Sequence, residues 1–338
     1  MQLSHSLAVT ALAVASFSAP RAQDELILYS SRHYDSDQQL YDAFEKETGI
    51  KVKLTEDSGD SLLARLRDPN APGDVLMTVD AGRLWAADDA GLFQPTESAV
   101  LEERIPAHLR HEDGHWFGLS MRARCIFYNR EAVDASELSD YESLADPKWK
   151  GRVLIRSSSN VYNQSLVGSI IARLGKETAE QWVKGLVANF ARTPQGGDTD
   201  QLRALAAGEG DVAIANSYYY ARLMKSDDPK DQEVVRKVAI FFPNQEGSGT
   251  HVNVGGAGIL KSSKNPEAAK RFLEFLAGDR AQQIFSSGNN EFPVVPGVEC
   301  DPILEPWTKK RFDEKTSVAE FGSLTGEALR MMDRAGWR

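Results

Sequence analysis

Short apolar runs alternate with amphipathic segments along the first third of the chain. The apolar runs predict strands at residues 25–30, 52–55 and 74–79. Between them, apolar side chains recur at helical spacing, as Leu40, Ala43 and Phe44 do before Gly49. Helices are therefore predicted at residues 37–48 and 60–67 and in a segment that ends at Gly91. This alternation is typical of an α/β protein.

The same alternation continues in the rest of the chain. Strands are predicted at residues 121–128, 152–156, 211–215, 238–242 and 251–260. Helices are predicted at residues 176–190, 200–207 and 266–277, the last with a proline at its start. A run of helix-capping residue types, Ser157 to Asn160, directly follows one of the strands.

The length of 338 residues exceeds what one ordinary core needs and predicts two lobes. No low-complexity linker separates two halves, so we expect lobes that are discontinuous in sequence. The first lobe would comprise residues 23–120 and 246–300, and the second residues 121–245, with C-terminal helices in 301–338 packing on the second lobe. A cleft between the lobes is then the default binding site.

Residues 1–22 differ from the rest of the chain. Residues 7–17 are apolar and small, and residues 18–22 resemble a processing region, although no Lys or Arg precedes the apolar core. This pattern predicts a secretory signal peptide and a periplasmic protein.

Charge and cysteine content narrow the picture further. The formal net charge is −10, which disfavours nucleic acid and anionic membrane surfaces as partners. An exported protein can oxidise its cysteines, but Cys125 and Cys300 are far apart in sequence and their pairing stays open. Cys125 lies in an apolar run and is equally consistent with a small buried side chain.

Tyrosines occur at the ends of three predicted strands. Tyr34 follows the first strand, Tyr162 follows the serine run, and Tyr218, Tyr219 and Tyr220 follow the strand at 211–215. Loops at the carboxyl ends of strands hold ligands in open α/β sheets. Spacing alone is also compatible with aromatic side chains that only pack at lobe surfaces.

Phenolate oxygen is a hard anionic donor, whereas zinc favours imidazole and thiolate. Four phenolates suit a hard trivalent cation, above all Fe(III). The metal must displace protons from groups with an ordinary pKa near ~10, so binding would release protons. A nearby cation would offset the excess negative charge, and Arg222 lies one helical turn beyond Tyr219.

Long motifs extend this interpretation. They are YSSRHYDSDQQLYDAFEKETGIKV, DVLMTVDAGRLW, GLFQP, DPKWKGRVLIRSSSNVYNQSLV, ANSYYYARLM and FFPNQEGSGTHVNVGGAGILK. Together they resemble the ferric-iron-binding proteins of bacterial ABC importers, in particular the Fut-type branch. The similarity runs in order from about residue 25 to the C-terminus.

The resemblance implies a two-lobe periplasmic binding protein of class II type, with discontinuous lobes joined by crossover strands. It implies that His33, Tyr34, Tyr162, Tyr218 and Tyr219 bind Fe(III), while Tyr220 has no matching ligand role. It also implies delivery to an inner-membrane ABC permease, a monomeric state and no catalysis.

Other functions have partial support in the sequence. The same fold could bind an oxyanion at Ser157–Asn160 or a polyamine in an acidic cleft. Residues 111–115 (HEDGH) match a zinc-protease motif, but that motif needs a helix and Asp113-Gly114 predicts a turn. An iron oxygenase would need open coordination positions, typically beside two His and one carboxylate.

Overall fold

The computed structural model describes residues 25–338, so the predicted signal peptide lies outside the described residues. The strands of this part of the chain are β1 (Glu25–Ser30), β2 (Lys51–Glu56), β3 (Val75–Thr78), β4 (Phe117–Asn129), β5 (Val153–Leu154), β6 (Val212–Asn216), β7 (Val238–Phe241) and β8 (Val252–Ile259). They are connected in the order β2-β1-β3-β8-β4-β6-β5, and β7 also pairs with β4.

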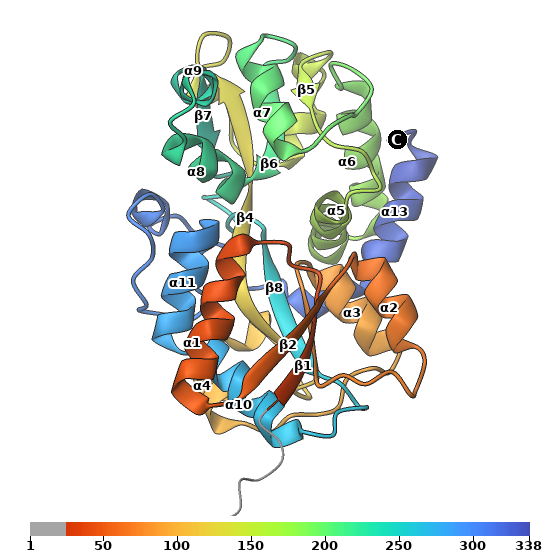
Figure 1. Ribbon diagram of the computed structural model, residues 1–338. Coiled ribbons are helices and arrows are strands. Elements are labelled where there is room, and N and C mark those ends of the chain that lie inside the picture. The colour runs from red at the N-terminus through yellow and green to blue at the C-terminus, as the bar shows by residue number, and fades with distance from the viewer. Residues whose placement is uncertain (1–24) are drawn as a thin grey trace, which may run out of the picture.

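One long strand joins two groups of strands. The first part of β4 pairs antiparallel with β8, which pairs with β3, and β3 continues to the parallel strands β1 and β2. The second part of β4, from Arg124 onward, pairs antiparallel with β6 and β7, and β5 lies parallel to β6. Figure 1 shows these groups as a lower and an upper lobe, with β4 running between them. We call them the β1 lobe and the β6 lobe.

Helices cover both groups of strands. They are α1 (Gln38–Thr48), α2 (Gly59–Leu66), α3 (Ala81–Asp89), α4 (Ala99–Arg104), α5 (Val161–Leu174), α6 (Lys176–Ala188), α7 (Asp198–Ala206), α8 (Ser217–Lys225), α9 (Pro229–Lys237), α10 (Pro266–Leu276), α11 (Asp279–Asn289), α12 (Val318–Ser323) and α13 (Thr325–Arg334). In the β1 lobe, α1, α10 and α11 pack against one another, while α2 and α3 contact β1 and β8. Within residues 25–338, no helix is long and apolar enough to cross a lipid bilayer.

The C-terminal helices contact elements of both lobes. Helix α12 packs on α3 and on α5, and α13 packs on α5 and α6. The contact between α12 and α5 is close, because a Cβ atom at Gly168 would lie 2.7 Å from the carbonyl oxygen of Phe321. The lobe boundaries predicted at residues 120, 245 and 300 remain a prediction.

Most predicted elements are present, with shifted ends. Strand β4 begins four residues before the predicted start at residue 121, because its first part completes the β1-lobe sheet. The strand predicted at 152–156 is reduced to Val153–Leu154, the residues that pair with β6 before the chain turns into the serine run. Cys125 is buried, Cys300 is partly buried, and both are free thiols.

Candidate functional site

A cavity of about 280 Å³ collects side chains from both lobes. The β1 lobe contributes the segment after β1, the start of α2, and Val79 and Arg83. The β6 lobe contributes side chains at the starts of α5 and α8. All five predicted ligands and the predicted cation line this cavity: His33, Tyr34, Tyr162, Tyr218, Tyr219 and Arg222.

Strand ends place the tyrosines. Tyr34 lies in the loop between β1 and a short 3-10 helix (Asp35–Asp37), where its carbonyl accepts a hydrogen bond of 2.9 Å from the Asp37 amide. Tyr162 lies in the first turn of α5, shortly after β5, and Tyr218 and Tyr219 lie in the first turn of α8, directly after β6. The prediction of tyrosines at three strand ends is therefore confirmed.

The three consecutive tyrosines lie in the first turn of α8, although tyrosine has only a moderate intrinsic preference for helix. Packing outweighs this weak intrinsic preference, since Tyr218 and Tyr220 are 2% and 4% exposed. Successive residues of a helix point in different directions, so Tyr218 and Tyr219 line the cavity while Tyr220 does not. Tyr220 points away from the cavity, with its hydroxyl 2.8 Å from the carbonyl oxygen of Val238 and its ring against Phe127 and Trp307.

The phenols that line the cavity are close together. The hydroxyl oxygens of Tyr162 and Tyr218 are 3.4 Å apart, and the rings of Tyr218 and Tyr219 stack with centroids 4.1 Å apart. Burial raises the pKa of Tyr34 to about 12, with further increases from Glu291 and Tyr162. Burial, followed by the neighbouring phenols, also raises the pKa of Tyr218 and that of Tyr219. Tyr34, Tyr218 and Tyr219 therefore hold their protons at neutral pH unless a cation displaces them.

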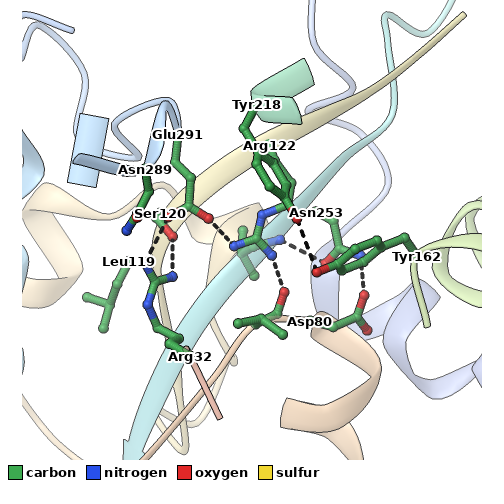
Figure 2. Close-up of polar contacts among 12 residues, drawn as sticks. Arg32, Asp80, Leu119, Ser120, Arg122, Tyr162, Tyr218, Asn253, Asn289 and Glu291 are labelled. Carbon is green, nitrogen blue, oxygen red and sulfur yellow. Dashed lines mark hydrogen bonds and ion pairs between the residues drawn. The ribbon is translucent and has the colours of Figure 1, made fainter. Parts of the chain in front are cut away.

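A buried ionic network lies beside the phenols, and sequence reasoning missed it. Arg122 on β4 bonds the carbonyl of Val79 and pairs with Glu291, and Glu291 also pairs with Arg32 at 2.9 Å (Figure 2). The Arg122 guanidinium lies 5.9 Å from the centre of the Tyr218 ring. Asp37 completes the network through a 2.7 Å bond to Arg32. A signal was present in the sequence, because arginines interrupt the apolar strand at MRARC.

The charges of this network cancel in pairs. Arg32 and Arg122 face Asp37 and Glu291, and both arginines are almost completely buried. The two other cations that line the cavity, Arg83 and Arg222, form no ion pair among the described residues. The guanidinium of Arg222 lies 5.9 Å from the ring centres of both Tyr218 and Tyr219. Arg83 and Arg222 are therefore available to offset excess negative charge in the cavity.

A second buried network positions the tyrosine-bearing helices. Arg124 donates to Asp198 at 2.8 Å, to Asn216 at 3.1 Å and to Asn163 at 2.6 Å. Asn163 follows Tyr162, and Asn216 stands two residues before Tyr218. One guanidinium thus links the first turns of α5 and α8, which fixes the spacing of the phenols.

The lobes also meet beside the cavity. Asp80, which caps α3 in the β1 lobe, accepts hydrogen bonds from Ser165 of α5 at 3.0 and 3.1 Å. The same carboxylate accepts a 2.6 Å bond from Asn253 on β8. These bonds connect α3 with the helix that carries Tyr162.

Comparison with known proteins places the chain among characterised relatives. Residues 39–311 match the family model described as bacterial extracellular solute-binding protein. The chain belongs to this family. Iron uptake protein A2 of Synechocystis sp. is 53% identical, with alignment over 98% of this chain and 96% of the relative. The major ferric iron-binding protein of Neisseria meningitidis is 28% identical over 98% of this chain and 99% of that protein.

Solved structures of family members agree with the fold. FutA (IdiA) of Trichodesmium, in complex with iron and citrate ligands, superposes with a TM-score of 0.90 at 54% identity, covering 93% of this chain and 100% of that one. Apo FutA2 of Synechocystis superposes with a TM-score of 0.89 at 53% identity, covering 93% and 99%. The predicted two-lobe binding-protein fold and the resemblance to the Fut-type branch are confirmed.

Proposed function

We propose that this protein captures Fe(III) in the cavity between its lobes and delivers it to an inner-membrane ABC permease. The observation that carries the proposal is the convergence of four tyrosines and one histidine on one small cavity. Tyr34 and His33 come from the β1 lobe, and Tyr162, Tyr218 and Tyr219 come from the β6 lobe.

The donor set matches a hard trivalent ion. Four phenolates and Fe(III) together carry a net charge of −1, and the unpaired guanidinium groups of Arg83 and Arg222 can neutralise it. Arg122 lies close to the Tyr218 ring, but Glu291 already balances its charge. The protons that leave the phenols pass to solvent as the metal binds.

The relatives support the same cargo. Two relatives are about half identical to this chain over nearly their whole length. One is named an iron uptake protein, and the other was solved in complex with iron and citrate. We infer that the protein acts outside the inner membrane, as its family description indicates. We further propose that it acts as a monomer and makes or breaks no bond in its cargo.

Capture involves both lobes. An ion bound both to Tyr34 and to the β6-lobe phenols favours a closed arrangement of the lobes over an open one. The size of this preference equals the difference between the binding free energies of the ion in the two arrangements. The hydrogen bonds between Asp80 and Ser165 add a direct contact between the lobes. We propose that opening of this contact accompanies release to the permease.

A visible spectrum tests the proposal. Titration of iron-free protein with Fe(III) should produce an intense tyrosinate-to-iron charge-transfer band that saturates at one ion per chain. A binding protein for an oxyanion or a polyamine would stay colourless with its ligand. Absence of the band, or a band of unchanged position and intensity in a Tyr218→Phe, Tyr219→Phe double variant, would contradict the proposed site.

A further inference from the structure

Three side chains outside the iron cavity form a compact cluster in the β1 lobe. Nδ1 of His115 lies 2.6 Å from Oδ1 of Asp88, and Nε2 of His111 lies 3.2 Å from Oδ2 of the same residue. The ligand atoms of the three residues all lie within 4.8 Å of one another. Both histidines belong to HEDGH, the segment that matches a zinc-protease motif but forms a turn before β4.

The turn holds the two imidazoles in a defined arrangement. The amide of His111 donates to the carbonyl of Trp116 at 3.0 Å, and the amide of Gly114 donates to the carbonyl of His111 at 3.1 Å. Gly114 has a φ of +69°, and a Cβ atom there would lie 2.6 Å from the carbonyl oxygen of Thr96. The two imidazole rings consequently lie parallel, at an angle of 5° with centroids 4.6 Å apart.

The cluster is distinct from the iron cavity. None of its three residues lines the iron cavity. The residue of α3 that does line the iron cavity is Arg83. Asp88 lies five residues further along α3, which corresponds to about 8 Å along the helix axis. Asp88 has no role in the proposed capture of Fe(III).

We propose that Asp88, His111 and His115 form a second metal site, which takes a divalent transition-metal ion such as Zn²⁺. Two imidazoles and one carboxylate suit this class of ion, whereas Fe(III) prefers the harder phenolates. Ligands about 2.1 Å from a tetrahedral zinc ion lie about 3.4 Å apart, so small side-chain movements accommodate the ion. The side chains of Asp88, His111 and His115 are 16%, 17% and 27% exposed, which leaves one side open for water ligands.

Binding exchanges existing hydrogen bonds for metal bonds. Nδ1 of His111 accepts a 3.1 Å bond from the Asp113 amide, so the neutral ring carries its proton on Nε2, facing Asp88. Coordination through Nε2 moves that proton to Nδ1 and breaks the bond to Asp113. The Asp113 amide is at the surface, where water can replace its partner. The exchange limits affinity without preventing coordination.

Zinc titration of the iron-loaded protein tests the site. Iron loading keeps the tyrosine cavity filled, and the visible band reports that iron stays in place. Isothermal titration calorimetry with Zn²⁺ should show one additional ion per chain. Asp88→Asn and His111→Gln should each weaken this binding by roughly tenfold or more, because each removes one of three protein ligands.

A matched control is available in the same stretch of chain. His108→Gln removes a partly buried histidine outside the cluster and should leave zinc binding unchanged. His115→Gln serves as a further variant if one of the first two fails to fold, as judged by circular dichroism and by its iron band. The proposal is overturned if the wild type binds no additional zinc, or if zinc binding is equally strong in the cluster variants.

Discussion

Replacement of Tyr218 by phenylalanine should change the number of protons that iron displaces. The ring is retained and its hydroxyl lies 3.4 Å from that of Tyr162, a long contact, so folding should be nearly unaffected. If four phenols ionise on binding, the apparent association constant falls about 10,000-fold for each unit decrease in pH. With three phenols left in Tyr218→Phe, the decrease becomes about 1,000-fold per unit.

The raised pKa values of the phenols determine in which direction, and over which pH range, the association constant for iron changes. Tyr34, with a pKa of about 12, is protonated throughout the neutral range, as are Tyr218 and Tyr219. Ionising Tyr34 at pH 7 therefore costs about 7 kcal/mol, which the metal bond must offset. Iron binding weakens as pH falls, and Tyr34, Tyr218 and Tyr219 keep contributing to the slope throughout pH 6 to 8 because they do not ionise on their own in this range.

The assay is competition for Fe(III) with a chelator of known proton and metal equilibria, followed at the tyrosinate band between pH 6 and 8. Tyr220→Phe is the matched control, because its hydroxyl bonds to Val238 and lies outside the cavity. It should keep the wild-type slope. A slope that is identical in Tyr218→Phe and wild type would refute the assignment of Tyr218 as an ionised ligand.

Further predictions follow from other parts of the site. Tyr34→Ala should leave weaker but detectable iron binding through the β6 lobe, and small-angle scattering should show less compaction on iron binding than in the wild type; no compaction of the wild type would contradict closure. Arg83→Gln and Arg222→Gln should each weaken iron binding in the competition assay. For Arg222 the loss should be roughly 5- to 100-fold, since its guanidinium lies 5.9 Å from the ring centres of Tyr218 and Tyr219 and a unit charge at such a distance contributes about 1–3 kcal/mol at a partly exposed site; unchanged affinities would exclude charge compensation by these residues. Glu291→Gln should lower the free energy of unfolding by about 3 kcal/mol at pH 7, measured by denaturant titration. Arg122 and Arg32 lower the folded-state pKa of Glu291 to about 2, so the stabilisation from these ion pairs is fully present above the ordinary pKa near 4.5. The difference in unfolding free energy between wild type and Glu291→Gln should therefore shrink as pH falls towards 2. A difference that is independent of pH would show that the ion pairs are not its source.

The cavity could be anticipated from sequence because its parts follow strand ends. Alternating apolar runs located β1 and β6, and ligand-type residues directly after such strands point towards the same edge of a sheet. Tyr34 and Tyr218 were found in this way. Arg222 followed from helical spacing, because it lies one turn beyond Tyr219 on α8.

The buried ionic networks could not be anticipated in the same way. Arg122 and Glu291 are 169 residues apart, and their pairing depends on where the segment after α11 lies relative to β4. Periodicity reports which face of an element is apolar, but it does not identify a partner brought in by the tertiary fold. Arg83 was missed for a similar reason, since on α3 it has the pattern of an ordinary surface residue.

The central position of β8 has a consequence for biosynthesis. The ribosome completes the β6-lobe strands β4 to β7 before it adds β8, the strand that links β3 to β4. Residue 75 pairs with residue 259, so the β1-lobe sheet stays incomplete until about three quarters of the chain has been made. Pairing across such a long separation in sequence is slow, because loop closure must precede the contacts that stabilise it. The β6-lobe strands can therefore pair with one another while the edge of β3 that later pairs with β8 is still exposed, and that interval is when the chain is most open to binding by chaperones or to aggregation.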